Sequence, residues 1–370
     1  MKVDIKQAQT PEEFAACARQ RYRVYTEEMN LYHDAADQQG QQLSDPDDAW
    51  SRFYYAAVDG EVVASLRFHW GSDGQFSEEW NAVYRFDSFA PDVLPEQMAV
   101  GSRLTVDKAY RGSALPGQLV AHGLTECLRD GKQLVFLDCV PHLINYYTRL
   151  GWRQYTDNVE DTNVGILVPM CLVFDDRDHL ARVGSNLLAL VDAVRPGVTA
   201  GPWVHRLFPH SSYAEAALRH GSQSAVFQLL SEGLLPIFQG FTTAQVQLLT
   251  DQSNILDCEA GALFIRRRTV YRSVFVVLSG QMEVLGDKDV VATIGKGELV
   301  GEMSFVLGGM RSADVRAGPE GAQVLSLQEN ILRKMLDADT ALASRFYHNL
   351  SRILALRLAG VGARGTEADA

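Results

Sequence analysis

The chain has 370 residues, of which 46% are hydrophobic and 22% charged, a globular composition long enough for two domains. Its net charge of −12 disfavours a nucleic-acid-binding protein, which usually carries a basic face. Without a long apolar run, an apolar leader or CxxC spacing among its five cysteines, we expect a cytoplasmic protein with no membrane span, disulfide framework or metal site.

The first 180 residues mix helix and strand signals. Thr10 and Glu13 have the spacing of a capping box at a helix start, and Asp59-Gly60 is typical of a tight hairpin. In chain order we expect a helix at 11–30, strands at 53–58, 62–68 and 101–106, a helix at 116–129, a strand at 134–140, a helix at 142–150 and a strand at 166–174. This mixture predicts an α+β domain over residues 1–180.

The residue pattern changes twice in the rest of the chain, first to a helical pattern and then to short strands. Residues 181–235 are apolar and helical in pattern, with helices expected at 181–194 and 213–232, and we interpret them as a helical connector. Short apolar runs separated by glycines follow, with strands expected at 262–266, 274–278, 282–285, 291–294 and 323–327. They predict a β-barrel or jelly roll over 236–360, with a helix at 342–358 and a disordered tail at 361–370.

A segment near the C-terminus has the parts of a pocket for a phosphate joined to a ribose. Gly301 allows the backbone to approach a ligand closely, and a short helical turn after it would direct N–H groups at an anion. Glu302 can accept a hydrogen bond from a sugar hydroxyl, and Arg311 can fork onto phosphate oxygens. The spacing therefore predicts a sugar-phosphate site.

This segment, together with Val277-Leu278-Ser279-Gly280 and Gly295-Lys296-Gly297-Glu298, resembles a cyclic-nucleotide-binding domain. The resemblance implies that Glu302 holds the ribose 2′-hydroxyl and that Arg311 pairs with the cyclic phosphate. It also implies that the terminal helix closes over the base near Arg352. The other implied contacts come from Gly301, Met303, Ser304, Ser312 and Ala313. Cyclic AMP is the favoured ligand, and cyclic GMP stays open.

Three segments of the first half resemble the GNAT acyltransferase fold. They are Ser102–Val106 with Tyr110-Arg111-Gly112, the predicted helix 116–129, and Asn145–Trp152. The resemblance implies that Tyr147 protonates the departing thiolate. It also implies donor contacts at Leu104, Val106, Arg111, Gly112 and Ser113. The chemistry itself needs little more than holding an amine beside a thioester and stabilising an oxyanion.

Two departures bear on the substrates. Ala114 and Pro116 stand where the phosphate loop of that fold has glycines, which favours a donor on acyl carrier protein over coenzyme A without excluding the latter. Four charged positions resemble those of the GNAT branch that contains acyl-homoserine-lactone synthases and N-acyl amino acid synthases. The resemblance implies a catalytic role for these residues, which are Arg21, Asp48, Arg67 and Arg103. That branch usually has a Glu where this chain has Val100, so the base is not identified.

Simpler explanations exist for several of these residues. Arg21 could pair with Glu28 on a helix surface, Tyr147 could be core packing, and Asp48 could belong to a solvated charge run. Asp138 is expected only to end a buried strand.

The sequence thus predicts an N-acyltransferase regulated by a cyclic nucleotide. The donor would be acyl-carrier-protein or acyl-coenzyme A, and the acceptor an amine such as a free amino acid. Two alternatives stay open: a cyclic-AMP-regulated protein lysine acetyltransferase, and a non-catalytic sensor with a decayed transferase domain. No nucleic-acid partner is expected, and the oligomeric state is left open.

Overall fold

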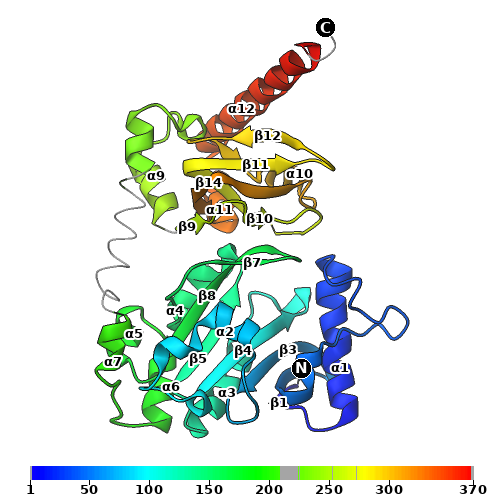
Figure 1. Cartoon of the computed structure of the whole chain (residues 1–370), viewed down its shortest axis with the longest axis vertical. Helices are drawn as coiled ribbons and strands as arrows, with labels where there is room; N and C mark the ends of the chain where they lie inside the picture. Colours follow the sequence, from blue (N-terminus) through cyan, green and yellow to red (C-terminus); the bar gives the residue numbers. More distant parts are fainter. Residues whose placement is uncertain (1, 209–223, 225, 252, 272, 368–370) are drawn as a thin grey trace. The chain divides into compact units, whose positions relative to one another are not determined.

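The computed structural model describes residues 2–208, 224, 226–251, 253–271 and 273–367. The chain forms two compact units, residues 1–212 and 213–370 (Figure 1). Within the described ranges, no helix combines the length and apolar character needed to cross a lipid bilayer.

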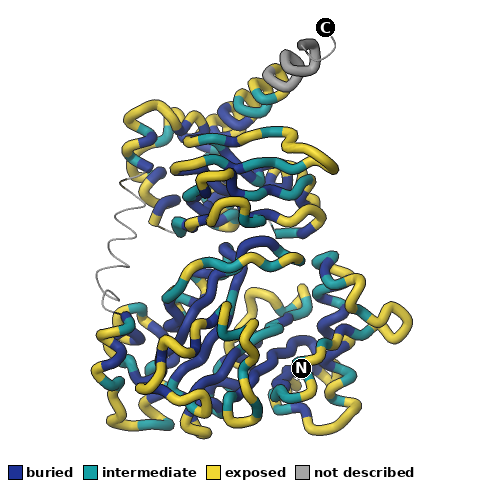
Figure 2. The backbone as a smooth tube through the Cα atoms, in the orientation of Figure 1, coloured by how far each residue is buried: buried dark blue, intermediate teal, exposed yellow. Residues whose placement is uncertain are grey.

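The first unit is built on a mixed sheet in the order β1-β2-β3-β4-β5-β8, with β6 and β7 paired to β8. Only β4 and β5 run parallel; the other neighbours are antiparallel. Its strands are β1 (Val3–Gln7), β2 (Arg52–Val58), β3 (Glu61–Trp70), β4 (Met98–Val106), β5 (Leu134–Cys139), β6 (Arg153–Gln154), β7 (Val159–Asp161) and β8 (Gly165–Val173). In Figure 2, β2, β3, β5 and β8 are buried along most of their length.

The parallel ladder in this sheet is short. Pairing between β4 and β5 ends at Val100 and Phe136, whereas β4 stays paired to β3 as far as Val106. Likewise, β5 stays paired to β8 as far as Cys139. The facing edges of β4 and β5 therefore separate beyond Val100, and backbone groups there are not used in the parallel ladder.

Helices pack on this sheet. The capping box at Thr10 is confirmed and starts α1, which ends at Arg21 and continues as a π-helix over Tyr22–Glu28. The α-helices are α1 (Pro11–Arg21), α2 (Glu78–Tyr84), α3 (Leu115–Arg129), α4 (Ile144–Leu150), α5 (Arg177–Arg182), α6 (Leu187–Val194) and α7 (Trp203–Leu207). The helix expected at 181–194 is thus split, and most of the one expected at 213–232 lies outside the described residues.

The second unit has an antiparallel sheet in the order β10-β14-β11-β12, with β13 on β11 and β9 on β14. Its elements are α9 (Thr243–Thr250), β9 (Asn254–Cys258), β10 (Leu263–Ile265), β11 (Val274–Leu285), β12 (Val290–Ile294), β13 (Leu299–Val300), α10 (Glu302–Leu307), β14 (Asp314–Leu327), α11 (Glu329–Ala338) and α12 (Thr340–Glu367). The jelly-roll-like architecture is confirmed, but in the described residues the sheet does not close into a barrel.

Two strands expected on either side of Gly280 are one bent strand, β11. Gly280 has φ +67° and lies at register shifts between β11 and β14. A Cβ there would lie 2.2 Å from the Gly321 carbonyl oxygen, so glycine allows the bend where the two backbones approach each other.

The expected connector at 181–235 is divided between the units. Trp203 and Val204 of α7 pack in the core of the first unit, whereas Val226 and Leu229 pack in the core of the second. The tail expected at 361–370 is also shorter, because α12 continues to Glu367; residues 368–370 lie outside the described residues.

Candidate functional site

Four charged residues predicted to be catalytic meet in the first unit. Arg21 Nη1 donates hydrogen bonds to both carboxylate oxygens of Asp48 at 3.0 Å. Arg67 Nη1 donates to Asp48 Oδ1 at 2.6 Å and also to Asp45. Arg103 Nη2 lies 3.1 Å from Asp45 Oδ2. The structure therefore joins residues of α1, β3, β4 and a 3₁₀ helix (Pro46–Trp50), and it adds Asp45, which precedes that helix and was not predicted from the sequence.

This charged cluster is mostly buried. The side chains of Arg21 and Arg67 are 1% and 4% exposed, so removing a carboxylate partner would leave a charge poorly solvated. Burial alone would raise the pKa of Asp45, but Arg67 and Arg103 outweigh burial and hold it below its ordinary value. Three guanidinium groups face two carboxylates, which leaves one excess positive charge. The expected surface pair between Arg21 and Glu28 is wrong.

Arg103 occupies an unusual place in β4. Its φ is +55°, and the β3–β4 register shifts between Ser65 and Arg67, so β4 bulges there. The guanidinium lies 4.6 Å from the ring centroid of Tyr32 and 5.7 Å from that of Tyr25. The bulge falls in the part of β4 beyond its pairing with β5. Leu104 and Val106, predicted donor contacts, lie on the same part of the strand.

Tyr147 lies on α4 and is buried, with its ring 5.7 Å from that of Trp152 in an edge-on arrangement. Burial raises the pKa of its hydroxyl well above the ordinary tyrosine value, so the hydroxyl is protonated at neutral pH, as an unperturbed tyrosine would be. This state suits a proton donor, and the same burial suits core packing. Gly151, with φ +111°, ends α4 as predicted.

The predicted donor loop is held by an ion pair. Both terminal nitrogens of Arg111 donate to the Glu28 carboxylate, at 2.5 and 2.7 Å, and its Nε donates to the Val106 carbonyl. Gly112 has φ +79°, and the Ser113 hydroxyl donates to the Tyr110 carbonyl. Arg111 would therefore have to leave Glu28 before contacting a donor phosphate.

A second acidic residue was not selected from the sequence. Asp138 lies on β5 and is partly exposed, although its neighbours Leu137 and Cys139 are buried. The Tyr84 hydroxyl of α2 donates a hydrogen bond to Asp138 Oδ1. Val100, where the resemblance leads one to expect a Glu, is fully buried in an apolar cluster. The available signal was one carboxylate inside an otherwise apolar strand.

In the second unit, the predicted sugar-phosphate segment at 301–313, called the cassette below, begins with a turn and a short helix. Gly301 has φ +83° and precedes α10. Arg311 is 5% exposed; its Nη1 donates to the Gly301 carbonyl at 2.9 Å and to the Ser304 hydroxyl at 2.7 Å, and its Nη2 donates to the Ser273 carbonyl at 2.7 Å. Burial lowers its pKa to about 10, and it forms no ion pair within the described part of the chain. Glu329 and Glu302 lie near enough to oppose this decrease in pKa, but neither carboxylate is in ion-pair contact with the guanidinium.

Glu302 is paired with the terminal helix. Its Oε1 accepts a hydrogen bond from Arg357 Nη1 of α12 at 2.7 Å, and Arg357 Nη2 donates to the Leu299 carbonyl at 2.6 Å. Glu302 and Arg311 therefore do not contact each other through their side chains; each has other partners. Of the remaining predicted contacts, Ser304 is buried, Ala313 is half-buried, and Met303 and Ser312 are exposed.

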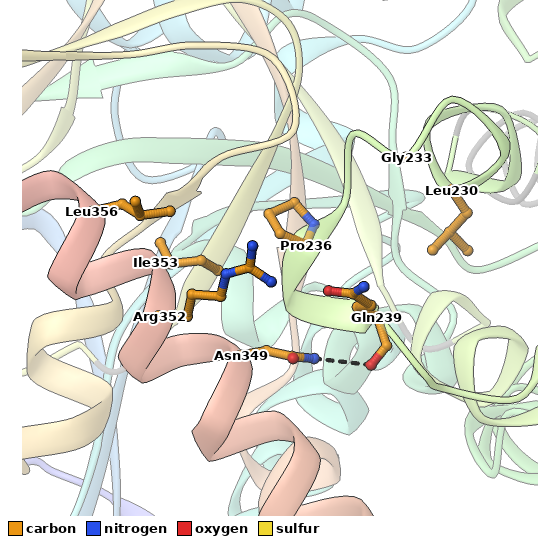
Figure 3. A pocket seen from close by; sticks show the side chains of 8 residues that line it. All are labelled: Leu230, Gly233, Pro236, Gln239, Asn349, Arg352, Ile353 and Leu356. Atoms are coloured by element: carbon orange, nitrogen blue, oxygen red, sulfur yellow. Dashed lines mark hydrogen bonds between the residues drawn. The ribbon is translucent and has the colours of Figure 1, made fainter.

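The terminal helix does not present Arg352 to the cassette. Figure 3 shows Arg352 and Asn349 of α12 facing Pro236 and Gln239, and Asn349 Nδ2 donates to the Gln239 carbonyl at 3.0 Å. These residues line a cavity of about 360 Å³ together with Leu230, Gly233, Ile353 and Leu356. Arg357, five positions later, is the residue of α12 that reaches the cassette, through Glu302.

Comparisons with known proteins agree with this division. Residues 20–121 match a family described as an acetyltransferase (GNAT) domain, and residues 255–339 match the cyclic nucleotide-binding domain. A search of curated proteins found no match.

Three solved structures are similar to parts of the chain. Escherichia coli ElaA is 20% identical over 46% of this chain and 99% of its own, with a TM-score of 0.33. A cyclic nucleotide-binding domain from Methylobacillus flagellatus KT is 21% identical over 34% and 72%, with a TM-score of 0.32. The Thermus thermophilus catabolite activator protein is 25% identical over 36% and 63%, with a TM-score of 0.31. By its family matches, the chain combines a GNAT acetyltransferase domain with a C-terminal cyclic nucleotide-binding domain.

Proposed function

We propose that this protein is an N-acyltransferase whose rate responds to cyclic AMP. The observation that carries the proposal is the presence in one chain of a GNAT domain and of Arg311, a buried guanidinium that forms no ion pair with any described residue. A cyclic phosphate would supply the anion, and its ribose would supply a hydroxyl for Glu302.

The acceptor we propose is a free amino acid, and the donor is an acyl thioester on acyl carrier protein or coenzyme A. The charged cluster of Arg21, Asp45, Asp48, Arg67 and Arg103 supports a small anionic acceptor, because it holds one more cation than anion. Tyr147, which is protonated at neutral pH, would give its proton to the departing sulfur.

The test is acyl transfer by the full-length protein with and without cyclic AMP. Acetyl-coenzyme A and an acyl-carrier-protein are each offered with free amino acids and with a lysine-containing peptide, and products are identified by mass spectrometry. We expect an N-acylated amino acid and a rate that changes by about 5- to 150-fold with cyclic AMP, the usual range of coupling between sites. Acylation of the peptide alone would instead identify a lysine acetyltransferase.

Two variants separate the parts of this proposal. Tyr147→Phe should lower transfer, and Arg311→Gln should abolish the response to cyclic AMP while leaving the basal rate unchanged. If neither donor yields an acylated product under any condition, the proposed catalytic function is rejected, and a cyclic-nucleotide sensor becomes the better description.

A further inference from the structure

We propose that Asp138 is the general base that removes a proton from the acceptor ammonium group. This inference rests on the proposed acyl transfer and assigns the proton acceptor that Val100 cannot provide.

The position of Asp138 follows from the strand register. Pairing between β4 and β5 ends at Val100 and Phe136, so Asp138 lies two residues beyond the last pair, where the strands have parted. Alternate residues of a strand share a face, which places Asp138 on the face of Phe136. Val100 and Phe136 belong to the same apolar cluster. A carboxylate therefore lies on the same face of the sheet as Val100, on the neighbouring strand and two residues further along.

Asp138 is held in a defined orientation. The Tyr84 hydroxyl donates to its Oδ1, and the Tyr155 hydroxyl donates to the Tyr84 carbonyl at 2.6 Å. Asp138 as a residue is partly exposed, so this support does not enclose it completely. Its carboxylate is also close enough to Arg103 and Tyr147 to interact with them electrostatically, so it belongs to the same region as the predicted catalytic residues.

Asp138 is also the better base among nearby carboxylates. Burial raises its pKa, Asp161 of β7 adds to this increase, and Tyr84 and Arg103 oppose it. The net direction is upward, toward the pH at which a base both holds and releases protons. The two carboxylates of the charged cluster, Asp45 and Asp48, are instead bound by guanidinium groups.

The proton balance is complete with these groups. Asp138 takes one proton from the ammonium group and passes it to water. The free amine attacks the thioester carbonyl carbon, and the carbon–sulfur bond breaks. Tyr147 gives its proton to the departing sulfur, and the nitrogen of the new amide returns one proton to the Tyr147 oxygen. One amide, one thiol and one proton are released.

The first test is Asp138→Asn in the full-length protein, assayed with acetyl-coenzyme A and the amino acid that the unsubstituted protein acylates best. We expect kcat to fall by about 100-fold or more, the usual contribution of a general base, while KM for acetyl-coenzyme A stays within about twofold. The fall of kcat/KM at acid pH, which is the acidic limb of its pH profile, should disappear. Asp175→Asn is the matched control: burial raises the pKa of Asp175 as it does that of Asp138, but Asp175 follows β8, at the opposite end of β5. It should keep both rate and profile.

A second variant, Tyr84→Phe, keeps the test meaningful if Asp138→Asn fails to fold. The Tyr84 hydrogen bond lowers the pKa of Asp138, so its loss should raise that pKa and move the acidic limb to higher pH. If the unsubstituted protein is active, either of two results overturns the assignment of Asp138 alone. One is an acidic limb of the pH profile that does not move in Tyr84→Phe; the other is full activity in Asp138→Asn. An inactive unsubstituted protein overturns the proposed function and this assignment together.

Discussion

Replacing Arg357 with Gln should tighten the binding of cyclic AMP. Arg357 donates to Glu302 at 2.7 Å, and Glu302 is the group that the proposed site offers to the ribose. Arg357 occupies Oε1 and offsets the charge of the Glu302 carboxylate, so we expect the ribose hydroxyl to compete with Arg357 for this group. Gln removes the charge but keeps a helix propensity close to that of Arg, so α12 should persist.

The size of the effect follows from the burial of the pair. Hydrogen bonds to charged groups contribute about 1.5–3 kcal/mol, whereas exposed ion pairs contribute only about 0.2–1 kcal/mol. The side chain of Glu302 is 8% exposed and that of Arg357 is 25% exposed, so we place this pair between the two, at about 1–2 kcal/mol. The expected decrease in Kd is about 5- to 30-fold.

The assay is isothermal titration calorimetry of the full chain with cyclic AMP. Arg352→Gln is the matched control, because Arg352 lies on the same helix and lines the cavity with Pro236 and Gln239 (Figure 3). It should leave Kd unchanged. Unchanged or weaker binding by Arg357→Gln would show that the Glu302–Arg357 pair does not compete with the ligand, and the reasoning would fail.

Three further substitutions test the two sites. Arg311→Gln should weaken cyclic AMP binding by about 100-fold, measured by the same calorimetry, because at least one charged hydrogen bond to phosphate is lost; binding within about threefold would contradict this. Gly301→Ala should lower the free energy of unfolding of the second unit by at least about 1 kcal/mol in denaturant titrations, since φ is +83° and the new Cβ would lie 2.4 Å from Arg311 Nη1. Asp45→Asn should reduce thermal stability at pH 7. Because the folded pKa of Asp45 is lowered, its contribution is present above about pH 4 and is lost as the pH falls through the folded value, so the two melting curves should converge in acid; a difference that persists there would refute the role of the ion pairs.

Local features were predictable from the sequence because they depend on neighbouring residues. The capping box at Thr10, the hairpin at Asp59-Gly60 and the left-handed Gly301 before α10 all appear in the structure. Each depends on the dihedral preferences or hydrogen bonds of a few consecutive residues. The motifs of both domains lie within such short segments, so the sequence alone determined that a GNAT domain precedes a cyclic nucleotide-binding domain.

Only the tertiary structure decided which distant groups meet. Helical spacing leaves Arg21 free to pair along its own helix, but burial brings it to Asp48. The turn of α12 that faces the cassette carries Arg357. The packing of the helix, and not its composition, determines which turn this is. The strand pattern gives Asp138 no special place; the structure shows that the β4–β5 ladder ends two residues before it. Such contacts depend on the register and packing of segments far apart in sequence, which local preferences do not specify.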